Sequence, residues 1–215
     1  PAAGVSEDLL RLYILGNVMG LLLSQRGLLV LHASAVRVGD EAIVFLGAPG
    51  WGKSSLAAAF YAQEFYVVSD DLSPLRVTPQ ATTLFPAFPR LKLDEEVALA
   101  LGFQPEALVH LHPQEEKRGL FIHHGFSNDP LPLRCAYVLG SGPAPTIEPI
   151  YPREVVIELL RHTFPTRLLQ PGTAAHLQQC TDLARQTPFF RLRRPPALAQ
   201  LPALVSLIKS HQAGL

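Results

Sequence analysis

The sequence feature that most constrains the fold is a glycine-rich loop, Gly47-Ala48-Pro49-Gly50-Trp51-Gly52-Lys53-Ser54. It fits G-x-x-x-x-G-K-[ST], a pattern in which curled backbone N–H groups form a nest for phosphate oxygens. The glycines allow φ values that a Cβ disfavours. We expect Lys53 to reach the β and γ phosphates and the Ser54 hydroxyl to ligate Mg²⁺. The loop, extended to Ser55, is therefore the predicted nucleotide site.

The residues on either side of the loop support this interpretation. Before it comes an apolar run typical of a strand, Ala42 to Leu46, and after it a strong helix-forming run, Ser55 to Phe60. Strand, glycine loop and helix in that order are the context that separates a phosphate loop from a chance match. The alternative is an ordinary glycine-containing turn, which this context disfavours.

A histidine is predicted near the loop by the pairing of two strands. Gly39-Asp40 is a two-residue turn of the type that joins hairpin strands, after a predicted strand over Leu28 to Val36. If Val38 pairs with Glu41, His32 falls opposite Gly47 and brings an ionisable ring to the mouth of the nucleotide site. A hydrogen-bonded core histidine is the alternative, and the register alone does not decide between them.

Two adjacent aspartates follow the next predicted strand. The run Phe65 to Val68 is strand-like and ends at Ser69-Asp70-Asp71. A strand–helix–strand unit predicts parallel neighbours, with functional groups at the carboxyl ends of the strands. One carboxylate could hold Mg²⁺ while the other accepts the proton of an attacking hydroxyl. An Asx turn that merely ends the strand is the alternative.

Three other groups of charged or ionisable residues stand out in the sequence. Arg90 and Lys92 alternate with leucines, which indicates that both cations share one solvated face. Lys117 or Arg118, in the charged loop from residue 114 to 119, could reach a transferring phosphoryl group. The pair His123-His124 has no third ligand at a telling spacing, so we expect it to face solvent.

The rest of the chain predicts one compact α/β domain over residues 1–215. An N-terminal helix over 6–25 is apolar from Leu12 to Ser24, and we expect it to be buried rather than membrane-spanning. The part from 152 to 215 is predicted to be mainly helical. Further strands are expected over 72–77, 82–85, 120–122, 133–139, 147–151 and 189–192, and further helices over 94–101, 153–161, 173–184 and 203–209.

Composition excludes some partners. The 215 residues carry 18 acidic and 18 basic side chains without a basic stripe, so we expect neither nucleic acid nor a membrane surface as partner. Cys135 and Cys180 are far apart and predict reduced core residues of a cytoplasmic protein. The chain begins at Pro1 rather than at Met, as a fragment lacking an N-terminal segment would.

Three segments together resemble a known family. Leu31-His32-Ala33-Ser34-Ala35, the phosphate loop and Ser69-Asp70-Asp71 resemble the bacterial HPr kinase/phosphorylase family. The run Phe85 to Leu91 and Lys117-Arg118 resemble the HPr-kinase-related kinases found with peptide-modification genes, including lasso-peptide tailoring kinases. The resemblance implies a P-loop sheet of mixed parallel and antiparallel strands with flanking helices. It also implies transfer of a phosphoryl group from ATP to a serine of a protein or peptide, such as a ribosomally made precursor.

The resemblance also implies roles for individual residues. Lys53 and the loop glycines would bind phosphates, Ser54 would ligate Mg²⁺ with help from Asp71, and Asp70 would be the base. His32 would pair with an aspartate, and Arg118 would assist transfer. Which aspartate does which is left open.

Ser55 and Ala48-Pro49 depart from the family's usual residues, so we carry over neither HPr as acceptor nor the reverse phosphorylase reaction. A nucleotide-dependent ATPase or switch and a small-molecule kinase remain alternatives. ATP or GTP as donor and a homo-oligomeric state stay open.

Overall fold

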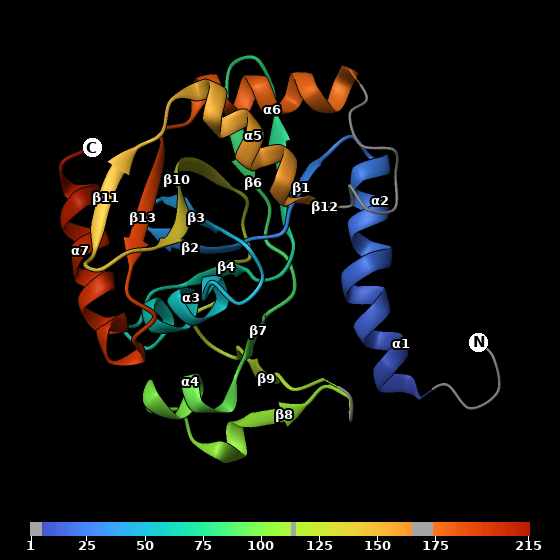
Figure 1. The fold of residues 1–215 in the computed structure, drawn as a ribbon. Helices are drawn as coiled ribbons and strands as arrows, with labels where there is room; N and C mark the ends of the chain where they lie inside the picture. The colour runs from blue at the N-terminus through green and yellow to red at the C-terminus, as the bar shows by residue number, and fades with distance from the viewer. Residues whose placement is uncertain (1–5, 113–114, 165–173) are drawn as a thin grey trace.

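The computed structural model describes residues 6–112, 115–164 and 174–215, and within them it is a mixed α/β fold (Figure 1). A ten-stranded sheet contains β1 (Leu29–Leu31), β2 (Ser34–Val38), β3 (Glu41–Leu46), β4 (Val67–Ser69), β5 (Ser73–Val77), β6 (Thr82–Leu84), β10 (Leu131–Ser141), β11 (Thr146–Pro149), β12 (Thr163–Phe164) and β13 (Phe189–Arg194). A three-stranded sheet contains β7 (Arg90–Leu93), β9 (Arg118–Phe121) and β8 (Leu108–His110), in that spatial order.

Helices flank both sheets. They are α1 (Glu7–Tyr13), the π-helical turn η1 (Ile14–Val18), α2 (Met19–Gln25), α3 (Lys53–Tyr61), α4 (Glu95–Ala100), α5 (Pro152–His162), α6 (Ala174–Gln186) and α7 (Leu201–Ala213), with short 3₁₀ turns η2 (Pro105–Ala107) and η3 (Leu198–Gln200). These elements confirm most of the predicted helices and strands. Thr173, the predicted start of one helix, and Gln114, within the charged loop, lie outside the described residues.

The long strand β10 is the centre of the large sheet. It pairs in parallel with β3 and β13, and its first residues pair antiparallel with β6. The order is β12-β1-β5-β6-β10-β3-β2-β4, and β13 with β11 continues on a branch from β10. The sheet is therefore mixed parallel and antiparallel, which confirms the predicted fold class.

Alternation along β3 explains why helices cover both faces of the sheet. Ile43 and Phe45 pack into an apolar layer with α3 and α7. Val44 and Leu46 point the other way, into a layer with α5 and α6. Successive side chains of a strand face opposite sides, so one apolar strand serves two layers. The two cysteines are buried and unpaired, one in each layer, as predicted.

The hairpin between β2 and β3 has the predicted register. Val38 pairs with Glu41 around a turn in which Gly39 has a φ of 62°. The single strand predicted over 28–36 is wrong, because the chain changes partners at His32. Before that residue β1 pairs with β5 and β12, whereas β2 pairs with β3 and β4. The His32 backbone N–H donates instead to the His162 carbonyl at 2.7 Å.

The predicted adjacency of β3 and β4 is also wrong. β2 lies between them and is antiparallel to both, so β3 and β4 are parallel without being neighbours. The predicted position of the site does not depend on this adjacency. Both strands still end at the same edge of the sheet, where the phosphate loop follows β3 and the aspartate pair follows β4.

The N-terminal helix is not buried as predicted. Between Glu7 and Gln25 only Gly20 is buried, packed against the Phe164 ring, while Tyr13 and Ile14 are 54% and 50% exposed. The helix stands beside the sheet and touches it through α2, near β1 and β12 (Figure 1). One side of an apolar helix therefore remains uncovered.

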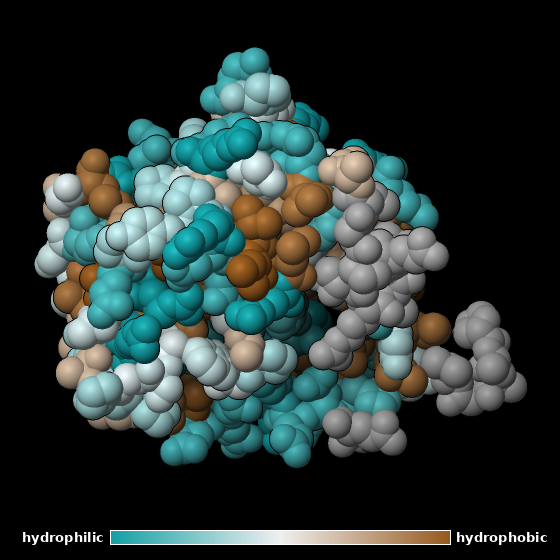
Figure 2. Space-filling view, turned by 45° about the horizontal axis from the view of Figure 1, so that its top comes forward, coloured by the Kyte–Doolittle hydropathy of each residue, from teal (hydrophilic) through white to brown (hydrophobic). Residues whose placement is uncertain are grey.

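The surface is otherwise mixed. Figure 2 shows a face that is largely hydrophilic, with a small apolar group near its centre. In the described part of the chain, no helix combines the length and the apolar character needed to cross a bilayer. His123 and His124 are exposed, as predicted.

Candidate functional site

The phosphate loop joins β3 to α3. Gly50 and Gly52 have φ values of 80° and 79°, in the left-handed region that favours glycine, and Gly52 caps α3. Lys53 is the first residue of that helix and is only 6% exposed. Its Nζ donates to the carbonyl oxygens of Gly47 at 2.9 Å and Ala48 at 3.3 Å. The ammonium group therefore lies against the backbone of the loop in which it is predicted to bind phosphate.

Asp70 ties the loop to the rest of the site. Its Oδ1 accepts hydrogen bonds from Ser34 Oγ at 2.6 Å and from Ser54 Oγ at 2.8 Å. Its Oδ2 accepts from the Lys92 backbone N–H at 2.8 Å. These donors come from β2, α3 and β7, so one carboxylate, 8% exposed, connects three elements at the sheet edge.

Asp71 faces the same region through different contacts. Its Oδ2 forms an ion pair with Lys92 Nζ at 2.9 Å, and its carbonyl accepts a hydrogen bond from His32 Nδ1 at 3.0 Å. The φ of Asp71 is 66°, which is rare for a residue other than glycine. Adjacent side chains of a regular strand point to opposite sides. The left-handed backbone is what lets two consecutive aspartates line one cavity.

The electrostatics of the two carboxylates differ. Burial, and then the charge of Asp71, raises the pKa of Asp70 to about 6, although the bonds from Ser34, Lys92 and Ser54 oppose the rise. Burial also acts upward on Asp71, but the charge and hydrogen bond of Lys92 outweigh it, so the pKa of Asp71 lies below its ordinary value. Burial and the charge of Lys53 lower the pKa of His32, which favours a neutral ring.

The raised pKa of Asp70 predicts a pH-dependent stability difference. The folded-state pKa is about 6 against 3.8 for the ordinary group, so ionised Asp70 costs roughly 3 kcal/mol at pH 7. That cost disappears as pH falls from about 6 to about 4, where the folded state is protonated first. Wild type should therefore gain about that much stability relative to Asp70→Asn between pH 7 and pH 4, measured by urea unfolding without nucleotide. A pH-independent difference would contradict the shift.

The structure brings most of the predicted residues together, but it places Arg118 elsewhere. Five of them lie at one sheet edge. Ser54 donates a hydrogen bond to Asp70, and His32 bonds to the Asp71 carbonyl. Lys53 is close enough to both aspartates for their charges to act on its pKa. Arg118 on β9 pairs with Glu95 at 3.2 Å and contacts His110. Its role in transfer stays a prediction. Burial is the main cause that lowers the pKa of Lys53, and the charge of the neighbouring Lys117 acts in the same direction.

Sequence reasoning missed three contributors to the site. The solvated face predicted for Arg90 and Lys92 is wrong: their alternation with Leu91 and Leu93 buries the leucines and turns both cations toward the aspartates. Ser34 was given no role, although it donates to Asp70. A hydroxyl inside an otherwise apolar strand, two residues after His32, was the available signal.

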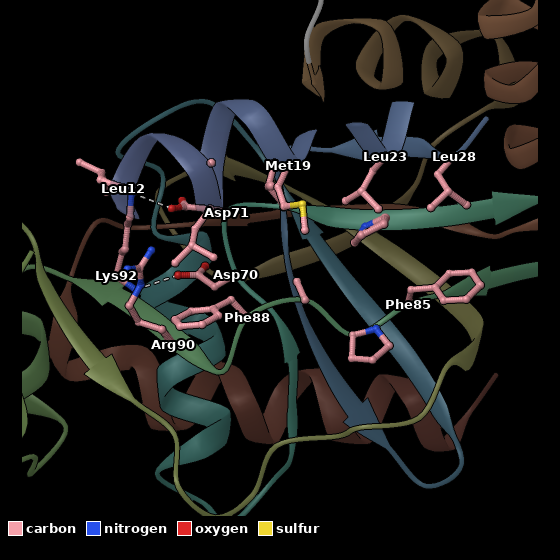
Figure 3. A pocket seen from close by; sticks show the side chains of 16 residues that line it. Leu12, Met19, Leu23, Leu28, Asp70, Asp71, Phe85, Phe88, Arg90 and Lys92 are labelled. Carbon is pink, nitrogen blue, oxygen red and sulfur yellow. Dashed lines mark hydrogen bonds and ion pairs between the residues drawn. The ribbon is translucent and has the colours of Figure 1, made fainter. Parts of the chain in front are cut away.

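A cavity of about 330 Å³ opens beside the aspartate pair. We call it the roofed cavity, because the N-terminal helix covers it (Figure 3). The covering residues include Leu12, Met19 and Leu23. Phe85 and Phe88 lie across from that helix. Asp70, Asp71, Arg90 and Lys92 gather at one end, with the Arg90 guanidinium 5.4 Å from the centre of the Phe88 ring.

Comparisons with known proteins give likenesses among solved structures but none in sequence. No protein-family model matches the chain, and no curated protein sequence matches it. Among solved structures, the chain is similar to the HPr(Ser) kinase/phosphatase from Coxiella burnetii. The TM-score is 0.47 at 14% sequence identity, over 86% of this chain and 97% of that chain. The likeness lies in the overall arrangement of helices and strands.

Proposed function

We propose that the protein is an ATP- and Mg²⁺-dependent kinase that transfers the γ-phosphoryl group to a serine hydroxyl of a peptide or protein. The observation that carries this proposal is the contact between the phosphate loop and the aspartate pair, made by Ser54 Oγ and Asp70 Oδ1 at 2.8 Å. Phosphoryl transfer needs a phosphate cradle, a carboxylate near the metal site and a second group for the acceptor proton, all in one place.

The donor atoms present fit Mg²⁺. This ion prefers oxygen ligands and is usually held by one or two carboxylates together with substrate phosphates. The Ser54 hydroxyl and the Asp70 carboxylate form such a pair at the mouth of the loop. Bound there, Mg²⁺ would neutralise the charge of the phosphate oxygens. Among the described residues no cluster of three or more His, Cys, Asp or Glu could hold a metal ion by itself.

We assign the base role to Asp71, which reverses the first assignment from the sequence. A base needs an oxygen able to accept the acceptor's hydrogen bond. Both oxygens of Asp70 already accept bonds from inside the protein. Asp71 is partly exposed, and its ion pair with Lys92 uses Oδ2. The higher pKa of Asp70 speaks for the opposite choice, but a cation beside Ser54 would lower that pKa.

The steps then follow from the contacts. The loop N–H groups and Lys53 hold the phosphates of ATP, with Nζ turning from the Gly47 and Ala48 carbonyls to phosphate oxygens. The serine oxygen forms a bond to the γ-phosphorus as the bond to the β–γ bridging oxygen breaks, and ADP leaves. The serine proton passes to Asp71. His32 holds the Asp71 backbone in position through its carbonyl.

The partners and compartment belong to the same proposal. A ribosomally made precursor peptide is one acceptor of the proposed class. Cys135 and Cys180 are buried free thiols, which supports a reducing compartment such as the cytoplasm.

The test is a transfer assay with γ-labelled ATP, Mg²⁺ and short serine-containing peptides. We expect label on the serine, detected by mass spectrometry, and none on matched peptides with alanine in its place. Release of free phosphate without any labelled acceptor would instead identify an ATPase. Label confined to small hydroxyl compounds would identify a small-molecule kinase.

A further inference from the structure

The roofed cavity changes in character along its length. Its polar groups, Asp70, Asp71, Arg90 and Lys92, gather at one end. Away from them the walls are apolar and come from the N-terminal helix on one side and the Phe85 to Phe88 segment on the other, as Figure 3 shows. An apolar pocket with a few convergent polar groups is the usual form of a ligand site, and about 330 Å³ lies within the usual size range.

The cavity is separate from the predicted phosphate site. None of the described residues that line it belongs to the loop from Gly47 to Ser55. The two meet at the aspartate pair, because Asp70 contacts Ser54 and also lines the cavity. A group in the cavity would thus lie next to the carboxylates that border the predicted phosphate site, where the acceptor of a phosphoryl transfer must be.

A second, more polar hollow of about 420 Å³ adjoins the first. It is lined by His32, His112 and Glu115, and it shares Leu12, Gly16 and Asp71 with the roofed cavity. The two spaces therefore meet along one stretch of the N-terminal helix and at Asp71. An extended chain can run through both and present its middle at Asp71, which favours a peptide over a compact small molecule.

We propose that the roofed cavity receives an apolar side chain next to the acceptor serine, so that the enzyme selects serines flanked by large apolar residues. This inference rests on the proposed kinase function. Its driving force is burial of apolar surface between the underside of the helix and Phe85 and Phe88. The cations Arg90 and Lys92 lie at the polar end, where they can contact carbonyl oxygens of the same peptide.

Gly16 provides a selective way to block the cavity. It lines both hollows, and a Cβ added there meets no atom within 4 Å. Gly16→Phe therefore adds a large ring at a position that borders both hollows, with open space around its Cβ. Val18→Phe is the matched control, because Val18 lies on the same helical turn, is 43% exposed and lines neither hollow.

The experiment compares serine peptides flanked by leucines with serine peptides flanked by glycines. Wild type and Val18→Phe should both show a KM about tenfold lower for the leucine peptides. Gly16→Phe should lose that preference while binding ATP with unchanged affinity, measured by titration calorimetry. Thermal unfolding checks that both variants are folded.

Three outcomes would overturn the inference. Equal KM values for both peptides in wild type would remove the apolar selection. A preserved preference in Gly16→Phe would place the selection elsewhere. Label on an apolar alcohol such as octanol, but on no peptide, would assign the cavity to a small molecule. If wild type labels glycine-flanked serines as well as leucine-flanked ones, only this inference fails, whereas failure to label any acceptor contradicts the kinase function itself.

Discussion

Replacing Asp71 by asparagine should lower kcat for phosphoryl transfer about a thousandfold and leave ATP affinity nearly unchanged. The amide keeps the shape of the side chain but cannot take up the serine proton. Its contact with Lys92 weakens because the ion pair at 2.9 Å is lost, so a small loss of stability is also expected. The measurement is steady-state transfer to a serine peptide, with calorimetry for ATP binding.

Two further variants make that result specific. Asp40→Asn is the control, since Asp40 sits in the β2–β3 turn, at the far end of these strands from the phosphate loop. Asp70→Asn should instead raise the Mg²⁺ concentration needed for half-maximal activity. If Asp71→Asn still transfers phosphate while Asp70→Asn fails to transfer it at every Mg²⁺ concentration, then Asp70 is the base.

Replacing Lys53 by alanine should reduce kcat/KM for ATP by at least about a hundredfold. The loss combines weaker binding of the phosphates with poorer stabilisation of the charge that spreads over them in the transition state. Transfer kinetics over a range of ATP concentrations would measure it. Lys209→Ala removes an exposed ammonium on α7 and should leave kcat/KM unchanged. Equal activity of the two variants would show that Lys53 has no part in nucleotide handling.

Local patterns were enough to predict the strand, the glycine-rich loop and the helix around Lys53. The loop needs only glycines, a lysine and a serine at fixed spacing, with an apolar strand before and a helix after. The hairpin register followed from one turn, because Gly39-Asp40 fixes which residues face each other. The roles given to Asp70, Asp71 and Arg118 stay predictions.

The parts that failed depend on contacts distant in sequence. Nothing near His32 indicates that the strand changes partners there, since its partners lie on β5 and β12. The alternation of Arg90 and Lys92 with leucines correctly predicted that the cations share one face of the strand. Whether that face meets solvent or the aspartates depends on where the small sheet packs. An apolar helix is expected to be buried, but this one packs on the sheet mainly through α2, near β1 and β12, and keeps its outer side uncovered.

The left-handed backbone at Asp71 has a consequence for how this protein can be stabilised. A non-glycine residue held at a φ of 66° carries roughly 1–3 kcal/mol of strain. Glycine would relax that strain and remove the carboxylate in the same substitution. Selection for thermal stability alone would therefore favour glycine at this position. The resulting protein would lack the carboxylate that the proposed reaction needs.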